Sequence, residues 1–276
     1  MLTFNNIRHF PECNRILLQA KQFICLRPHH ALAEYISNYN ITFPTKTLMP
    51  EGFTIMPSGC ATLTISCDGQ NLNMELDGPT SRPYVANDLA LPEILITIEF
   101  KPAGLYALTS IPQNELADST IPFADANPHL AAQISNLVET AETILGLAEG
   151  LDMLLLSNMR AAFHPQLALA FWNIKQLAGN APIKMLSAET CYSERQLNRI
   201  FTQYVGVGTK AFSRLIRVNN AFKLLQKPAS SVSLVSDFAG YHDLSHFVRD
   251  FKLVCDMTPQ EFRNNMSDFY INPTKF

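Results

Sequence analysis

The C-terminal part of the sequence repeats itself after 50 residues. Apolar residues, an arginine and a turn-like segment coincide at this shift. The coinciding stretches are Leu197-x-Arg199-x-Phe201 with Phe247-x-Arg249-x-Phe251, and Gly208-Thr209-x-x-Phe212 with Thr258-Pro259-x-x-Phe262. Each copy has the spacing of a short helix, a turn of about three or four residues and a second helix. The repeat therefore predicts two helix-turn-helix units in this chain.

Every segment after the short joint at 161–165 has helical periodicity, with serine, glycine or proline where one segment meets the next. The predicted helices are 166–178, 182–190, 193–204, 209–226, 232–239, 243–254 and 259–266. Ser193, followed three residues later by Gln196, forms a capping box that predicts the start of the second helix of the first unit. Asp243 is the expected N-cap of the corresponding helix in the second unit.

The second helix of the first unit is expected to have an apolar back and a polar front. The back holds Leu197, Ile200, Phe201 and Tyr204, and the front holds Arg195, Asn198, Arg199 and Thr202, with Gln196 beside them. Arginine can bind guanine, and asparagine can bind adenine, through paired hydrogen bonds in the major groove. A solvated surface would explain one such front equally well. The front recurs, however, as Ser245, His246, Arg249 and Lys252, which favours DNA binding.

Residues from about 167 to 266 resemble the DNA-binding domain of the AraC/XylS family of bacterial transcription regulators. The family pattern is present as Ser193-x3-Leu197-x-Arg199-x-Phe201-x4-Gly206, Phe212-x4-Arg217-x3-Ala221-x2-Leu224-Leu225, Gly240-Tyr241-x-Asp243-x2-His246-Phe247-x-Arg249-x-Phe251-Lys252 and Thr258-Pro259-x2-Phe262-Arg263. The resemblance implies that helix 209–226 holds the two units rigidly, so that their second helices enter successive major grooves. His242, Leu244 and Ser245 are then expected near DNA with the polar fronts, and Lys184 and Lys210 near phosphates.

The departures from the family pattern fall mostly at positions of small residues. Ser187 and Ser236 replace an alanine, Thr209 replaces a proline, and Cys191 and Asp256 replace glycines. Glycine is the residue that tolerates a positive φ, so the turn geometry is in question at Cys191 and Asp256.

His242 and His246 are spaced as two zinc ligands on one helical turn would be. Spacing alone is weak support for a metal, and ordinary surface or core histidines are a second alternative. Because both lie in the second unit, proximity to DNA is the favoured interpretation, and no metal, cofactor or catalytic residue is expected.

Charge is distributed unevenly along the chain. Residues 1–165 carry 8 Lys and Arg against 16 Asp and Glu, a formal charge of −8, whereas residues 166–276 carry 13 against 8, a formal charge of +5. The basic end is the candidate for binding a polyanion such as double-stranded DNA.

The sequence has neither a signal-peptide pattern nor an apolar run of about 18 residues. A cytoplasmic protein without membrane contact is expected.

The N-terminal half has the alternating pattern of strands. ATLTISC and NLNMEL flank Asp68-Gly69, a hairpin signal, and 93–100 is rich in β-branched and aromatic residues. Helices are predicted from residue 28 through PHHALAEYISNY, and over 128–145 and 147–160. The last two contain more leucine and isoleucine than one exposed helix would leave in water, so they either cover the sheet or pair with another subunit.

The predicted architecture is α+β. An antiparallel sheet or small barrel with helices occupies 1–162, and an all-α domain of two helix-turn-helix units joined by a long helix occupies 166–276. Met49-Pro50-Glu51-Gly52 and Phe100-Lys101-Pro102-x-Gly104 resemble, at low specificity, the sensor half of one AraC/XylS subgroup, which implies sensing and dimerisation. His29-His30 beside Glu34 is either a polar pocket wall or an exposed helix surface.

The sequence predicts a regulator that binds a specific DNA site, with a homodimer and a small-molecule effector as candidate partners. One alternative is a ligand-independent regulator whose N-terminal half only dimerises. Another is a DNA-tethered enzyme with a reactive cysteine, but none of the six cysteines lies in such a motif and none forms a CxxC pair. Free, mostly buried thiols are expected, with a redox pair of Cys60 and Cys67 as the remaining alternative. The sequence therefore predicts that this protein is not an enzyme.

Overall fold

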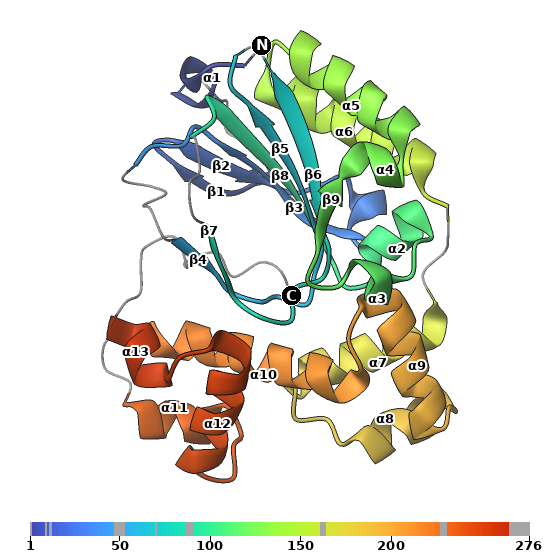
Figure 1. Cartoon of the computed structure of the whole chain (residues 1–276), viewed down its shortest axis with the longest axis vertical. Helices are drawn as coiled ribbons and strands as arrows, with labels where there is room; N and C mark the ends of the chain where they lie inside the picture. The colour runs from blue at the N-terminus through green and yellow to red at the C-terminus, as the bar shows by residue number, and fades with distance from the viewer. Residues whose placement is uncertain are drawn as a thin grey trace.

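The computed structural model describes residues 2–8, 10, 13–46, 53–69, 71–86, 91–160, 164–226 and 231–264. Its N-terminal half contains a seven-stranded antiparallel sheet (Figure 1). The strands are β1 (Ile16–Ala20), β2 (Phe23–Leu26), β3 (Ile36–Thr42), β5 (Thr62–Cys67), β6 (Leu72–Asp77), β8 (Ile94–Phe100) and β9 (Thr120–Pro122). They lie in the order β1-β2-β3-β8-β5-β6-β9, so β1 and β9 form the two ends of a sheet. Two short strands, β4 (Phe53–Ile55) and β7 (Tyr84–Ala86), pair separately.

The hairpin predicted at Asp68-Gly69 is confirmed, since β5 and β6 pair in register on either side of it. Gly69 has a φ of +87°, which a residue with a side chain rarely adopts. The Asp68 carboxylate accepts a hydrogen bond from the Asn71 backbone nitrogen at 2.7 Å and so fixes the turn. The strand predicted at 93–100 is also confirmed as β8, which lies in the middle of the sheet.

The helix predicted from residue 28 is wrong beyond its first turn. A short 3-10 helix, η1 (His30–Leu32), is followed at once by β3, which is buried at six of its seven positions. A strand between β2 and β8 buries both of its faces, and this packing overrides the helical pattern of the local sequence. His29 and His30 lie at η1, where their rings contact each other with centroids 4.1 Å apart.

Helices cover the apolar face of the sheet (Figure 1). They are α2 (Gly104–Thr109), α3 (Gln113–Leu116), α4 (Phe123–Ala126), α5 (Pro128–Thr140) and α6 (Ile144–Asn158), and α1 (Phe4–Arg8) lies near the N-terminus. The predicted division at 145–147 is corrected to residues 141–143, because the Thr143 hydroxyl caps α6 by accepting from the Gly146 nitrogen at 3.0 Å. Leu130, Ile134, Ile144, Leu151 and Leu155 are buried in one hydrophobic cluster with the strands. These two helices therefore cover the sheet.

The described residues from 164 onward form only helices, as predicted, with boundaries that differ by one or two residues. They are α7 (Pro165–Gln176), α8 (Ile183–Thr190), α9 (Glu194–Val205), α10 (Thr209–Leu225), α11 (Val232–Phe238), α12 (Leu244–Cys255) and α13 (Pro259–Asn264). Within the part of the chain that the structure describes, none of the helices is both long and apolar enough to span a bilayer. The Met49–Gly52 motif, the joint at 161–163 and the end of the last predicted helix lie outside the described residues.

Two hydrophobic cores lie on either side of α10. Phe212 and Ile216 pack into a core with α7, α8 and α9, whereas Leu215, Val218 and Phe222 pack into a core with α11, α12 and α13. One helix thus contributes side chains to both cores, and this shared element connects the two helix-turn-helix units (Figure 1).

Candidate nucleic-acid interface

The second helix of each unit begins at a cap that its own sequence supplies. The Ser193 hydroxyl accepts from the Gln196 backbone nitrogen at 3.2 Å, and the Gln196 side-chain oxygen accepts from the Ser193 nitrogen at 3.0 Å. The predicted capping box is therefore confirmed at the start of α9. In the second unit, the Asp243 carboxylate accepts from the His246 nitrogen at 2.7 Å, which confirms Asp243 as the N-cap of α12.

The two turns that departed from the family pattern adopt the backbone expected of glycine. Cys191 ends α8 with a φ of +57°, and Asp256 ends α12 with a φ of +55°. Both side chains are exposed, so neither has to fit into a core. The cost is local backbone strain at each position.

The polar front of α9 is exposed at Arg195, Gln196, Asn198 and Arg199, and Thr202 is half-buried. Asn198 is partly engaged, since its side-chain oxygen accepts from the Thr209 backbone nitrogen at 3.2 Å. The Thr202 hydroxyl donates to the Asn198 carbonyl at 2.9 Å. Both amide hydrogens of Asn198 remain available, whereas one lone pair of its oxygen is taken by the Thr209 nitrogen of α10. The two arginines have no such contact among the described residues.

The corresponding front of α12 is also exposed. Leu244, Ser245, Arg249 and Lys252 face solvent, and they line an open surface groove together with Val248 and Leu253. His242 is exposed beside its neighbour Asp243, with its Nδ1 3.4 Å from the carboxylate. Lys184, at the start of α8, and Lys210, at the start of α10, are exposed as well.

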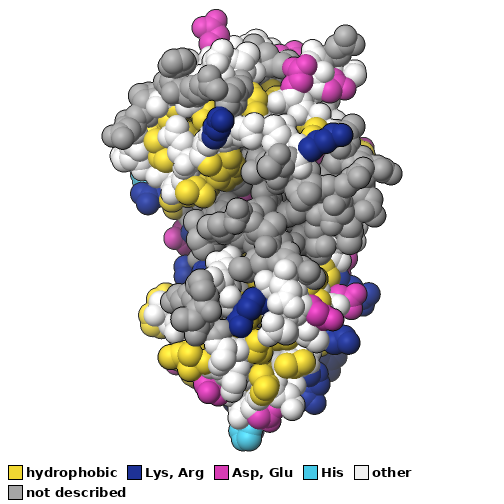
Figure 2. All heavy atoms as spheres, turned by 90° about the vertical axis from the view of Figure 1, so that its left-hand side faces the viewer, with side chains coloured by type: hydrophobic (Ala, Val, Ile, Leu, Met, Phe, Trp, Pro, Cys, Tyr) yellow, Lys and Arg dark blue, Asp and Glu magenta, His cyan; other side chains and the backbone are white. Residues whose placement is uncertain are grey.

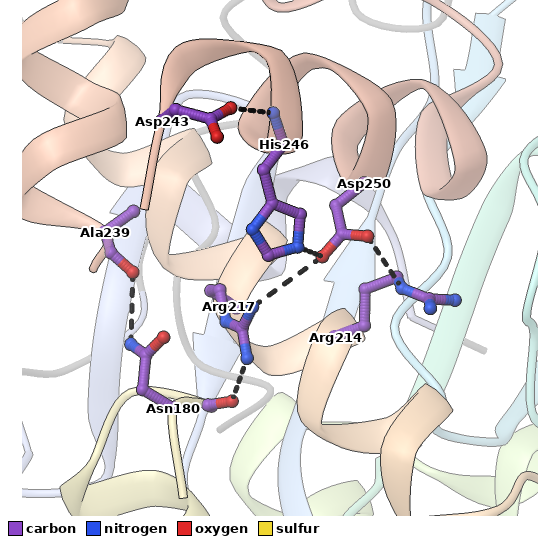
Figure 3. Close-up of polar contacts among 8 residues, drawn as sticks. Asn180, Arg214, Arg217, Ala239, Asp243, His246 and Asp250 are labelled. Carbon is purple, nitrogen blue, oxygen red and sulfur yellow. Dashed lines mark hydrogen bonds and ion pairs between the residues drawn. The ribbon is translucent and has the colours of Figure 1, made fainter. Parts of the chain in front are cut away.

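His246 lies on the flank of α12 rather than on its front. Its Nε2 is 3.6 Å from the Asp250 carboxylate, and its ring packs edge-on against Tyr241 with centroids 5.2 Å apart. Figure 3 shows the ring directed toward Asp250 and Arg217. Sequence spacing alone had grouped His246 with the residues of the front.

Asp250 is the centre of a polar cluster that the sequence did not single out (Figure 3). Its carboxylate, 8% exposed as a residue, lies 3.1 Å from Arg214 Nε and 3.7 Å from Arg217 Nη1. Both arginines lie on α10, so the pairs attach α12 to the connecting helix. Their spacing of three residues was the available signal, but it does not reveal the partner.

The same cluster also joins the first unit to the second. Arg217 Nη2 donates to the Gly179 carbonyl at 2.9 Å, in the turn before α8. The side-chain amide of the adjacent Asn180 donates to the Ala239 carbonyl at 3.1 Å, at the end of α11. We call Asp250, Arg214, Arg217 and Asn180 the inter-unit clasp. Its contacts restrain how the two units are placed relative to each other.

The N-terminal half contacts the helix that carries the first polar front. The rings of Tyr106 on α2 and Tyr204 on α9 lie 4.2 Å apart, and the Gln203 amide is 3.4 Å from the Tyr106 hydroxyl. Helix α3 packs beside α9 (Figure 1), and the Asn219 amide donates to the Pro57 carbonyl at 3.3 Å. These contacts bring the sheet-bearing half to the back of the first unit.

Among the described residues, no three His, Cys, Asp or Glu side chains are grouped so that they could hold a metal ion. None of the six cysteines, all of which the structure describes, forms a disulfide, and Cys25, Cys60, Cys67 and Cys255 are buried. Burial raises the pKa of Cys25 to about 12 and raises that of Cys255 as well, so both thiols are protonated and poor nucleophiles.

Residues 186–265 match the model of a helix-turn-helix domain family, and residues 25–122 match that of a domain of unknown function, DUF6597. A probable transcription factor of Proteus vulgaris, PqrA, is 31% identical over 96 residues, which are 34% of this chain and 79% of that protein. The chain belongs to the AraC/XylS family. An uncharacterized helix-turn-helix transcriptional regulator of Haemophilus influenzae is 29% identical over 96 residues, which are 35% of this chain.

The chain spans only 29% of the length of the Haemophilus relative. A solved AraC-type regulator from Chromobacterium violaceum aligns with 38% of this chain and 94% of its own, at 25% identity and a TM-score of 0.35. The match to the helix-turn-helix domain family covers α8 to α13, where both fronts lie.

Proposed function

We propose that the chain is a transcription regulator that binds a specific site in double-stranded DNA. The observation that carries the proposal is the pair of exposed fronts on α9 and α12, each with an arginine at the same place in the 50-residue repeat, Arg199 and Arg249. Family membership and the positive charge of residues 166–276 support it. The protein would then act in the cytoplasm, where bacterial DNA is found.

The proposal assigns roles to the residues of both fronts. Arg195, Arg199, Ser245 and Arg249 contact base edges, and Lys184, Lys210 and Lys252 contact phosphates, which position the protein without reading sequence. Asn198 contacts DNA mainly through its two amide hydrogens, because the Thr209 nitrogen occupies one lone pair of its oxygen and holds that oxygen toward α10. Such an asparagine suits an acceptor such as guanine or a phosphate better than adenine, which needs a donor and an acceptor together.

Selection of the full chain against random duplexes tests this function. An enriched sequence that the protein binds more tightly than a scrambled duplex, with affinity that falls steeply as salt rises, is the expected result. Failure to enrich any sequence, with only weak and salt-sensitive binding to every duplex, would contradict a specific regulator.

We further propose that residues 1–162 and 166–276 act as separate domains and that the first dimerises. The largest cluster lies wholly in the first half, and the two clusters of the second half take only Ala103 and the partly buried Met56 from the first, which supports the division. Most leucines of α5 and α6 pack against the sheet, so few of them remain available for a contact with a second subunit. It rests on Met153 and Leu156, exposed on α6 at 68% and 38%. Sedimentation of the full chain and of its Met153→Glu variant would separate dimer from monomer.

A small polar effector in the N-terminal half is the remaining part of the proposal. Asn38, Asn40 and Glu99 are buried polar residues on β3 and β8, and they lie on the sheet face opposite Tyr39 and Ile98. Buried polar groups on a sheet suit a ligand that forms hydrogen bonds. Mass spectrometry of small molecules released from the purified protein tests it. A chain that releases none would favour a ligand-independent regulator whose first half only dimerises.

A further inference from the structure

The front of α12 differs in chemistry from the front of α9. Six of the described residues line its groove, and three of these six are apolar. They are Leu244, Ser245, Val248, Arg249, Lys252 and Leu253. Figure 2 shows yellow hydrophobic side chains on the surface of the lower, C-terminal half of the molecule, close to dark blue lysines and arginines. A recognition surface of this composition cannot rely on hydrogen bonds alone.

The internal repeat identifies where the two fronts diverge. At the shift of 50 residues, Arg249 corresponds to Arg199, so the central arginine is the same in both units. Three polar positions of α9 become apolar in α12. Glu194, Asn198 and Gln203 correspond to Leu244, Val248 and Leu253. The second unit has therefore lost polar groups at half of its groove-lining positions.

These apolar side chains do not serve the core of the second unit. Leu244 and Leu253 are 44% and 60% exposed, and neither belongs to the buried cluster that holds Phe247, Phe251 and Val254. Leucines left in water on a continuous surface indicate that something else covers them. Leu244 is the first residue of α12, and the N-terminal residues of such a helix are the ones that reach base edges.

Charge identifies the kind of partner. Arg249 and Lys252 lie in the same groove as the leucines, and none of the described residues that line it is acidic. A polyanion fits this combination better than an apolar protein surface does, because both cations keep a partner when water is removed. The major groove of DNA presents one apolar group beside its phosphates and acceptors, the C5-methyl group of thymine.

We propose that the second unit recognises thymine through contact of Leu244 and Val248 with C5-methyl groups, while the first unit reads its segment through hydrogen bonds. The inference rests on the proposed DNA-binding function. It implies that the half of the operator facing α12 is rich in A·T pairs at the positions nearest Leu244. Arg249 supplies a polar base contact in the centre of that half, and Ser245 supplies a second one beside Leu244.

Replacing thymine by deoxyuridine removes the methyl group and leaves every hydrogen-bonding group in place. The operator obtained by selection is first footprinted with the wild type and with Arg249→Ala, to assign one segment to α12. Thymines are then replaced in each segment in turn, and the full chain is titrated against each duplex. We expect about a fourfold loss of affinity for each contacted methyl in the α12 segment. Less than a twofold change is expected in the α9 segment.

The variants decide whether the leucine and valine are responsible. The double variant Leu244→Ala/Val248→Ala should bind the thymine and deoxyuridine duplexes with equal affinity. If the double variant folds poorly, Leu244→Ala alone is measured in its place. Leu169→Ala, which truncates a 38% exposed leucine on α7, should keep the full difference. Equal affinity of the wild type for both duplexes, or an unchanged difference in Leu244→Ala, would overturn the inference. Failure of selection to enrich any duplex would overturn the proposed function with it.

Discussion

At the scale of single residues, Arg199 and Arg249 provide the most direct test of base recognition. Both are exposed at the same point of the repeat, and an arginine that binds guanine through two hydrogen bonds contributes about 1–3 kcal/mol of discrimination. Arg199→Ala and Arg249→Ala should each weaken binding to the selected operator by that amount. Binding to a scrambled duplex should change little. Equal losses on both duplexes would mean that these side chains contact only phosphates.

Asp243 is expected to make the stability of α12 depend on pH. The pKa of this exposed carboxylate is lowered, first by the hydrogen bond from the His246 nitrogen and then by His242. A carboxylate with a lowered pKa stabilises the fold above its unfolded pKa, and that contribution is lost as the pH falls through the folded pKa. Asparagine also caps helices but does not titrate. When the pH is lowered from neutral to below about 4, the melting temperature of Asp243→Asn should therefore fall less than that of the wild type.

Asp243→Ala provides the contrast, since it removes the cap at every pH. It should melt below the wild type at neutral pH and should approach it in acid, as followed by circular dichroism. An identical pH profile in the wild type and in Asp243→Asn would show that this cap does not titrate in the relevant range.

At the scale of elements, the inter-unit clasp should contribute to stability. Asp250→Asn keeps the size of the side chain but removes the charge that pairs with Arg214 and Arg217. Loss of one partner from a buried ion pair costs about 3–5 kcal/mol. Since the arginine side chains are 26% and 19% exposed, we expect about 2 kcal/mol here. Denaturant unfolding measures it, with the exposed Asp237→Asn as a control that should stay within about 0.5 kcal/mol. Equal free energies of unfolding for Asp250→Asn and Asp237→Asn would show that the inter-unit clasp does not stabilise the fold.

The contrast between the two halves explains which elements could be predicted from sequence. In α9 and α12 the cap, the apolar period and the repeat all indicate the same helix, so the caps were predicted correctly and the bounds to within one residue, although His246 lies on the flank of α12. Around residues 28–39 the local pattern favoured a helix, but pairing of β3 with β2 and β8 decided the outcome. Asp250 shows the same limit within the candidate site, because its partners lie about 33–36 residues earlier on another helix. Contacts of that kind depend on packing that no short spacing encodes.

At the scale of the whole molecule, the two units should read one face of a single duplex. Helix α10 contributes to both cores, and Arg217 links Gly179 in the first unit to Asp250 in the second. Two units restrained in this way have little freedom to change their separation. Helix-turn-helix units on one face of DNA lie about 34 Å, or roughly 10 bp, apart. One chain should then protect two major-groove segments at that spacing, within a footprint of roughly 20 bp.

Hydroxyl-radical footprinting of the full chain on the selected operator measures this spacing. A dimer should protect two such pairs of segments, and the Met153→Glu variant, if it is monomeric, should protect one. Inserting 5 bp between the two segments of a pair turns the second segment to the opposite face of the duplex, because a helical turn takes about 10 bp. Binding to that duplex should fall to the level of a single segment, since the clasp prevents α12 from following. Retained affinity, with both segments still protected, would show that α10 bends and that the two units are not held as one body.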